Sequence, residues 1–277
     1  MKDYFGYSGK MCVVTGASSG MGRAACEMLV ELGAEVFALS RTPCEVPGIK
    51  QYIQTDIADR ASIDAAFKKL PEKIERFFGV AGISGIKNDF NMTFNVNFTA
   101  NKYMVEEYLQ KRMPSGSAIV FVTSTAGRDW TTHIETIRGL VEAKGWEATE
   151  KATERFGNKD SYAPIAYRFG KLAMTNYAVD LAVTLGKQGI RVNVVLPGST
   201  DTGMKDEFIQ AAGSLEKVLA NTGTANRFAS SEEMAGPIVF LNSDMCSFVS
   251  GEEFYVDAAD FAMVKTGHKE DIYIRKS

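Results

Sequence analysis

Short apolar runs alternate with longer amphipathic segments along the whole chain. An apolar run rich in β-branched residues is typical of a buried strand, whereas apolar positions three and four residues apart indicate a helix. This pattern predicts seven strands, at 11–15, 36–39, 52–54, 77–80, 118–122, 191–196 and 253–256. Helices are predicted at 20–33, 61–70, 95–112, 166–186 and 231–242. Such alternation favours a doubly wound parallel sheet with helices on both faces, an α/β fold.

Three intervals depart from this regular spacing. Residues 41–56 contain two prolines and a glycine, Pro43, Pro47 and Gly48, which leave no room for a full helix. The stretch 82–95 is also short, whereas 125–166 is long. Because no repeat or low-complexity linker divides the sequence, residues 1–277 are predicted to form one domain.

Composition and charge narrow the possible functions. With 45% hydrophobic residues the chain can fill a core, and its net charge of −3 without a basic block argues against nucleic-acid binding. No apolar stretch is long enough to cross a membrane, and the first ten residues hold no signal core, so we expect a cytoplasmic protein. Four scattered cysteines and two histidines predict a reduced chain without a metal site.

A glycine-rich turn, T-G-A-S-S-G-M-G at 15–22, lies between the first strand and the first helix. Gly16, Gly20 and Gly22 lack a β-carbon, so a pyrophosphate can approach the backbone N–H groups at the positive end of the helix. A glycine-rich loop without a ligand is the alternative. The position between strand and helix favours a dinucleotide site.

A possible acid–base pair lies on the predicted helix 166–186. Tyr167 and Lys171 are four residues apart, so their side chains share one helix face. A nearby lysine lowers the pKa of a tyrosine by favouring the phenolate, which suits proton transfer at neutral pH. Because this spacing also arises by chance, an exposed surface pair is the alternative.

The spacing T-G-x-x-x-G-x-G resembles the fingerprint of the short-chain dehydrogenase/reductase family, and further motifs follow in the order of that family to about residue 260. The resemblance implies a single-domain Rossmann-type fold that binds a nicotinamide dinucleotide. It implies that Tyr167 transfers a proton, Lys171 lowers its pKa and binds the nicotinamide ribose, Ser124 orients the carbonyl, and Asn97 holds a proton-relay water. The cofactor residues that it implies are Gly16, Ser18, Ser19, Gly20, Met21, Gly22, Ser40, Arg41, Asp56, Ile57, Ala81, Gly82, Tyr167, Lys171, Pro197, Gly198, Thr200 and Thr202.

The end of the second strand carries Ser40 and Arg41 where a carboxylate would favour NAD(H). A guanidinium suits a 2′-phosphate, so NADP(H) is the predicted cofactor, with NAD(H) as the alternative. The chain departs from the family pattern at Gly79 and Val80, which replace two asparagines, and at Ala258, which replaces a glycine.

A long insertion, about 128–160, separates Ser124 from Tyr167. T-H-I-E at 132–135 predicts a capping box and one helix, and 146–156 predicts a second helix with Glu147 and Lys151 as an exposed pair. The insertion resembles that of bacterial 3α-hydroxysteroid dehydrogenase/carbonyl reductases and coniferyl-alcohol dehydrogenases. We expect it to help shape the substrate pocket, with packing on the scaffold alone as the alternative.

The segment after Pro197 predicts short amphipathic helices that form a lid. Its apolar residues would suit a bulky apolar small-molecule substrate: Met204, Phe208, Ile209, Leu215, Val218 and Leu219. A polar C-terminal tail is expected at about 262–277.

The predicted activity is that of an alcohol dehydrogenase or carbonyl reductase, acting on a hydroxysteroid, a bile acid or, as the alternative, an aryl alcohol of the coniferyl type. A non-catalytic nucleotide-sensing regulator and a lyase or epimerase are the other classes considered. Family members commonly pair through the helices that hold the asparagine and the tyrosine, or around the final helix and strand. The resemblance therefore implies a homodimer or a homotetramer.

Overall fold

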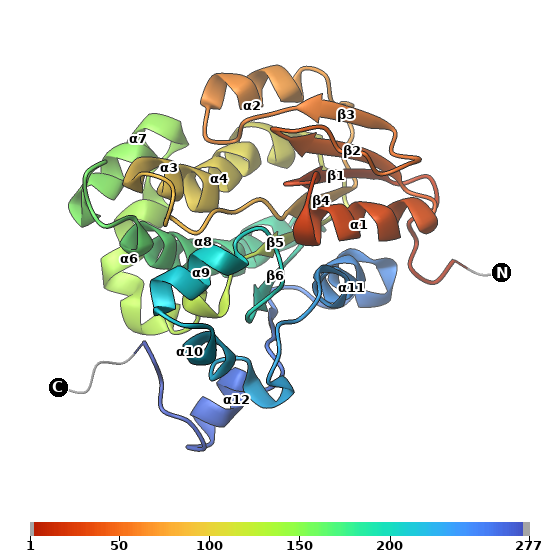
Figure 1. The fold of residues 1–277 in the computed structure, drawn as a ribbon. Coiled ribbons are helices and arrows are strands. Elements are labelled where there is room, and N and C mark those ends of the chain that lie inside the picture. Colours follow the sequence, from red (N-terminus) through yellow and green to blue (C-terminus); the bar gives the residue numbers. More distant parts are fainter. Residues whose placement is uncertain (1–2, 274–277) are drawn as a thin grey trace.

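Seven parallel strands run through the centre of the molecule, in the order β3-β2-β1-β4-β5-β6-β7 (Figure 1). The computed structural model describes residues 3–273. The strands are β1 (Met11–Thr15), β2 (Glu35–Ser40), β3 (Gln51–Gln54), β4 (Arg76–Gly79), β5 (Ala118–Val122), β6 (Arg191–Pro197) and β7 (Glu253–Val256). All seven predicted strands are confirmed, each within a residue or so of its predicted ends. The order reverses between β1 and β4, which is where open parallel sheets place their ligands.

Alternate residues of each strand point to opposite faces of the sheet, and helices cover both faces. Val13 belongs to one hydrophobic cluster, whereas its neighbours Cys12 and Val14 belong to the other. Helices α1 (Gly20–Glu31) and α11 (Ser231–Asn242) cover the second cluster (Figure 1). The other face is covered by α2 (Arg60–Phe67), the long α8 (Ala163–Gly186) and the helix between β4 and β5. As predicted, no helix forms between β2 and β3.

The helix between β4 and β5 is interrupted by two π-helical turns. It consists of α3 (Phe90–Phe94), α4 (Ala100–Met104) and α5 (Gln110–Arg112), joined by π-turns at Asn95–Thr99 and Val105–Leu109. It begins at Phe90 rather than at residue 95 as predicted, because the Asp89 carboxylate accepts the Met92 amide at 2.8 Å and caps it.

The insertion forms α6 (Ile134–Glu142) and α7 (Gly145–Thr153), flanked by 3₁₀ turns. Its apolar side chains, Ile137, Leu140 and Trp146, are buried in the main hydrophobic cluster. The predicted capping box is wrong: His133 precedes the helix without a side-chain cap, and Thr132 donates to the Asp129 carbonyl instead. The predicted Glu147–Lys151 pair is wrong too, because Glu147 pairs with Arg60 of α2.

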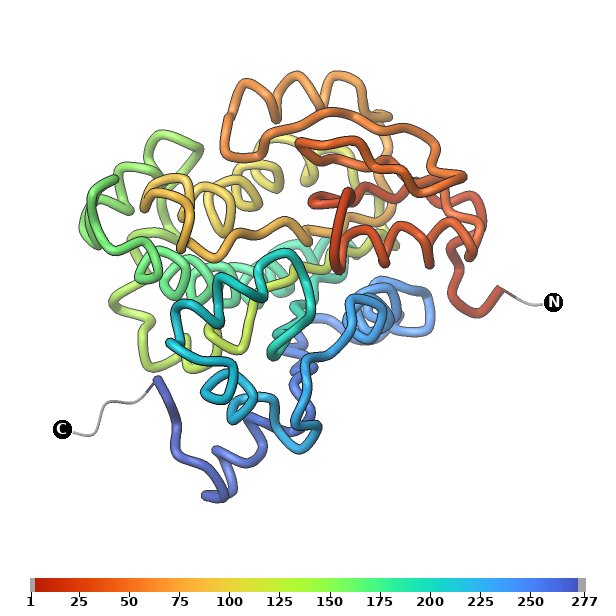
Figure 2. Tube along the Cα trace, in the orientation of Figure 1, coloured from red at the N-terminus to blue at the C-terminus, as the bar shows by residue number. Residues whose placement is uncertain are grey.

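The last third of the chain surrounds the carboxyl ends of β6 and β7. It adds α9 (Lys205–Ala212), α10 (Leu215–Leu219) and α12 (Asp260–Lys265), and the chain turns back after α12 (Figure 2). The short helices predicted after Pro197 are thus confirmed as α9 and α10, whereas their role as a lid stays a prediction. No helix within residues 3–273 is long and apolar enough to cross a membrane, and all four cysteines are free and buried.

Candidate active site

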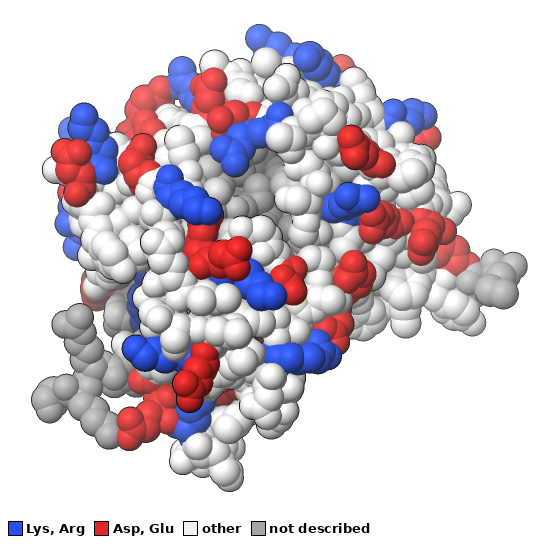
Figure 3. All heavy atoms as spheres, viewed as in Figure 1, with Lys and Arg blue, Asp and Glu red and all other residues white. Residues whose placement is uncertain are grey.

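Two adjoining cavities open at the carboxyl ends of the strands, one of about 260 Å³ and one of about 230 Å³. They share Met21, Gly82 and Thr202 in their walls. Figure 3 shows the hollow on this face, with basic side chains around it. The first cavity contains the predicted residues Gly16, Ser18, Ser19, Gly20, Met21, Gly22, Ser40, Arg41, Asp56, Ile57, Ala81, Gly82 and Thr202. The second adds Asn97, Ser124, Tyr167, Lys171, Pro197, Gly198 and Thr200. Every predicted site residue therefore lines one of the two.

The glycine-rich turn is shaped for close approach by a ligand. Gly16 has φ +69°, and a β-carbon there would lie 2.8 Å from the Ala81 α-carbon. The Thr15 hydroxyl accepts the Val80 and Ala81 amides at 3.1 and 3.2 Å, which fixes the end of β4 against the turn. Ser19 precedes α1 but does not cap it, so amides of the first turn are left for a ligand. This cradle fits the pyrophosphate of a dinucleotide.

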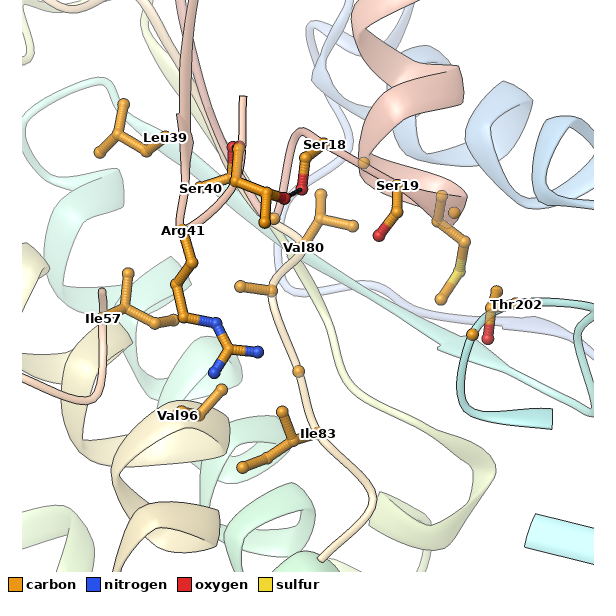
Figure 4. Close-up of a pocket in the computed structure, with 18 of the residues that line it drawn as sticks. Ser18, Ser19, Leu39, Ser40, Arg41, Ile57, Val80, Ile83, Val96 and Thr202 are labelled. Atoms are coloured by element: carbon orange, nitrogen blue, oxygen red, sulfur yellow. Dashed lines mark hydrogen bonds between the residues drawn. The ribbon is translucent and has the colours of Figure 1, made fainter. Parts of the chain in front are cut away.

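The far end of the first cavity holds Arg41. Figure 4 shows its guanidinium reaching across the cavity toward Val96 and Ile83. Side chains from β3 hold its backbone, since Tyr52 and Gln54 donate to the Arg41 carbonyl at 3.4 and 3.3 Å. Among residues 3–273 no carboxylate pairs with this guanidinium. Arg41 is therefore placed to meet an anionic ligand.

Other polar groups around Arg41 serve the loop itself. The Ser40 hydroxyl donates to the Thr42 carbonyl at 2.8 Å, and the Thr42 hydroxyl donates to Ser18 at 3.0 Å. Thr42 is a cavity residue that the sequence analysis missed. The Asp56 carboxylate accepts the Ala58 amide at 2.9 Å and shapes the turn after β3. The guanidinium of Arg41 is thus the cationic group among the residues that line this cavity.

The second cavity brings together Tyr167 and Lys171 from α8 with Ser124 from the end of β5. The Lys171 ammonium donates to the Val122 carbonyl at 3.2 Å and lies 5.7 Å from the centre of the Tyr167 ring. A β-carbon at Gly82 would lie 3.1 Å from the Asn97 side-chain oxygen and 3.4 Å from that ammonium, so the chain passes close to both groups there. The three side chains therefore face one enclosed space, as the order of motifs predicted.

Burial sets the protonation of this pair. It lowers the pKa of Lys171 to about 7. It raises the pKa of Tyr167 above the ordinary value, and a hydrogen bond with Ser124 offsets only part of that rise. The sequence analysis expected Lys171 to lower the pKa of Tyr167, whereas the net direction in this structure is upward. The reason is that the cavity removes the Tyr167 hydroxyl from water, and this desolvation outweighs the Ser124 hydrogen bond.

Asn97 lies in the first π-turn, beside Lys171 and Gly82. Its amide nitrogen donates to the Ile83 and Thr93 carbonyls at 2.9 Å, and its oxygen accepts the Ile83 amide at 3.3 Å. The side chain therefore ties the loop after β4 to the interrupted helix. π-turns are frequent at functional sites because they re-aim side chains.

The lid helices and the insertion contribute unequally to the second cavity. Met204, Phe208 and Val218 line it, and the Phe208 ring lies 5.6 Å from that of Tyr167. The other apolar lid residues, Ile209, Leu215 and Leu219, do not line it. From the predicted insertion, about 128–160, Arg128 lines it, but no residue of α6 or α7 does, so the two inserted helices do not form its wall. Instead α6 packs against α8, and α7 packs against α3 and α4.

The sequence analysis missed the C-terminal contribution to the site. Ile272 and Tyr273 line the second cavity, together with Arg128 and Asp260. The tail was predicted only as polar, because its path depends on contacts with residues far away in the sequence. The aromatic and apolar residues inside an otherwise charged tail were the one available signal.

Comparisons with known proteins agree with this fold and site. The short chain dehydrogenase profile matches residues 10–135, and the profile named enoyl-(acyl carrier protein) reductase matches 152–258. The chain is 28% identical to a coniferyl-alcohol dehydrogenase from a Pseudomonas species, over 90% of this chain and 95% of that one. It is 30% identical to an L-rhamnose 1-dehydrogenase (NAD(P)(+)) from a Sphingomonas species, with the same coverage.

The fold recurs in the 3α-hydroxysteroid dehydrogenase of Pseudomonas sp. B-0831, solved with NADH. The TM-score is 0.75 at 21% identity, over 95% of this chain and all of that one. Fold and site together define an oxidoreductase that acts on hydroxyl and carbonyl groups. The chain belongs to the short-chain dehydrogenase/reductase family.

Proposed function

We propose that the protein is an NAD(P)(H)-dependent alcohol dehydrogenase or carbonyl reductase that interconverts a hydroxyl and a ketone on a bulky, largely apolar substrate. The observation that carries this proposal is the convergence of Ser124, Tyr167 and Lys171 in a cavity continuous with the glycine-rich cradle. The nicotinamide cofactor supplies or accepts the hydride when bound.

In the direction of reduction, Ser124 orients the carbonyl oxygen and Tyr167 gives it a proton. The raised pKa of Tyr167 keeps its hydroxyl protonated at neutral pH, which is the state that an acid needs. The positive charge of Lys171 then stabilises the phenolate that remains. Asn97 holds the loop after β4 and is the proposed site of a proton-relay water.

Arg41 supports a preference for NADP(H), because a guanidinium without a carboxylate partner in residues 3–273 suits a 2′-phosphate. The solved relatives leave both cofactors in view. One of these structures contains bound NADP, and another contains NADH. NAD(H) is therefore the alternative that the cofactor experiment must test.

An aryl alcohol is the second candidate substrate. The coniferyl-alcohol dehydrogenase relative favours it, and so does the aromatic Phe208 beside Tyr167. The lid residues Met204 and Val218 suit a steroid ring equally well. A purely nucleotide-sensing role is disfavoured, because such a protein has no use for a complete Ser-Tyr-Lys set.

Turnover of a panel of steroid and aryl ketones with NADPH and NADH tests the proposal. Tyr167→Phe should reduce kcat at least a hundredfold, the usual worth of a general acid, while the Kd of the cofactor stays nearly unchanged. Cofactor binding by fluorescence serves as the control for folding. Retention of a tenth of the wild-type activity would rule out Tyr167 as the acid.

A further inference from the structure

Arg128 lines the second cavity, and Arg168 stacks on the Tyr273 ring that lines it. Neither arginine has a role in the proposed proton transfer. Arg128 lies just after β5, and its side chain is only 1% exposed. Arg168 directly follows Tyr167 on α8 and donates to the Ala126 carbonyl at 3.1 Å. Burial lowers the pKa of Arg168. Two desolvated guanidinium groups near the reacting residues are costly unless an anion balances them.

The C-terminal segment now supplies that anion. The Asp271 carboxylate accepts from Arg128 at 2.7 Å and from the Tyr273 amide at 2.8 Å. The Tyr273 ring lies between the guanidinium groups, 4.8 Å from Arg128 and 4.3 Å from Arg168. The chain thus presents to the two arginines a carboxylate and an aromatic ring that are two residues apart in the sequence.

Other carboxylates satisfy Arg128 only weakly. Asp129 and Asp260 lie 3.8 and 3.9 Å away, beyond hydrogen-bond distance. The Arg128 Nε and one Asp129 oxygen are buried without a hydrogen-bond partner. Asp260 is also held by Lys269. Within residues 3–273, Arg168 forms no ion pair with a carboxylate. Asp271 is therefore the carboxylate that Arg128 hydrogen-bonds within residues 3–273, and its departure would leave Arg128, Arg168 and Lys269 facing only Asp129 and Asp260.

We propose that Arg128 and Arg168 form an anion subsite of the second cavity, that the carboxylate of an organic acid substrate binds there, and that Asp271 and Tyr273 occupy the subsite until it does. The inference rests on the proposed function, since it names the substrate class of the same cavity. It makes the substrate an apolar alcohol or ketone that carries a carboxylate, rather than a neutral one. The apolar lid residues would contact the body of the substrate.

Binding without turnover tests the subsite separately from the activity. The probes are 2-naphthoate and its neutral counterpart 2-naphthamide, measured by calorimetry on the full chain. Asp271→Asn removes the competing charge, so it should bind naphthoate several-fold more tightly than the wild type. In that variant naphthoate should bind about tenfold more tightly than the amide, the usual worth of a charge-assisted hydrogen bond.

Adding Arg168→Met to Asp271→Asn should abolish the preference for the acid. Arg168 is used because the wholly buried Arg128 is the riskier position for folding. Arg138→Met is the matched control, because Arg138 is an exposed arginine of α6 remote from the cavity, and it should keep the preference. Equal binding of acid and amide by Asp271→Asn, or a preference that survives Arg168→Met, overturns the inference. Either result leaves the turnover test of Tyr167→Phe unaffected, so the two proposals fail separately.

Discussion

Lys171 connects the chemistry of the site to the stability of the fold. This residue is 4% exposed, and its ammonium donates to the Val122 carbonyl. Within residues 3–273 it forms no ion pair with a carboxylate. The folded chain therefore holds this lysine with a pKa of about 7, against an ordinary value of 10.5. At a pH between these two values, Lys171 is protonated in the unfolded chain and loses that proton when the chain folds.

Stability should therefore depend on pH through Lys171. Between about pH 7 and pH 10.5 the unfolded chain binds more protons at this site, so the cost of burying the lysine falls as pH rises. Urea unfolding of the wild type and Lys171→Met should show the wild type gaining relative stability across this window. Lys187→Met, at an exposed position, is the control and should run parallel to the wild type. If the unfolding free energies of the wild type and Lys171→Met change in parallel with pH, the lowered pKa of Lys171 is contradicted.

Arg41 should decide the cofactor. Arg41→Asp should weaken NADPH binding by about 1.5–3 kcal/mol, the range for hydrogen bonds to charged groups, and relatively favour NADH. The reason is that the aspartate repels a 2′-phosphate and accepts ribose hydroxyls instead. Titration of both cofactors by fluorescence measures the change. A wild type that already prefers NADH would show that the prediction from Ser40 and Arg41 is wrong.

At the scale of elements, the two π-turns and the inserted helices alter a regular α/β pattern. The first π-turn places Asn97 against the loop after β4, where a straight α-helix from Asp89 would rotate it elsewhere. The insertion instead extends the core, since Trp146 packs edge-on against Tyr103 with ring centres 5.6 Å apart. The inserted helices therefore support the scaffold, α7 against α3 and α4 and α6 against α8.

Trp146→Ala should therefore destabilise the protein without altering substrate affinity. Loss of a buried tryptophan costs about 3–5 kcal/mol. Chemical denaturation measures this loss, and KM should stay within about twofold of wild type, because no residue of α6 or α7 lines the second cavity. Glu142→Ala, an exposed change in α6, is the control and should stay within about 0.5 kcal/mol. A raised KM with unchanged stability would restore the expectation that the insertion shapes the pocket.

At the scale of the whole molecule, two of the surfaces with exposed apolar side chains lie on elements that family members use for pairing. Phe240 lies on α11, Met245 and Phe248 lie between α11 and β7, and the Phe248 side chain is fully exposed. Val183 on α8 is 65% exposed. Exposed apolar clusters are typical of interfaces. We expect a homo-oligomer that uses the surface around Phe248, as the family resemblance implies.

Phe248→Asp should dissociate that interface without unfolding the chain, because the side chain makes no packing contribution within one molecule. Light scattering should give half the wild-type mass, and the circular dichroism spectrum should be unchanged. Val183→Asp tests the α8 surface in the same way, and a reduced mass there as well would indicate a tetramer. An unchanged mass in both variants would contradict the proposed surfaces.

The order of strands and helices followed from the sequence, because buried strands and amphipathic helices have different apolar periods. The sequence also predicted where four site residues lie: Gly16, Ser124, Tyr167 and Lys171. Each lies at a strand end or on a strong helix, where the local sequence fixes its position relative to the sheet.

Tertiary structure alone decided the rest. The pKa of Tyr167 depends on how deeply the assembled cavity buries it, which no local spacing expresses. The C-terminal segment is held at the site by contacts with Arg128 and Arg168, each more than a hundred residues earlier in the chain. The inserted helices bury their apolar faces against other helices, α6 against α8 and α7 against α3 and α4. Burial and long-range charge pairing arise only when distant segments meet. Local sequence patterns therefore could not predict them.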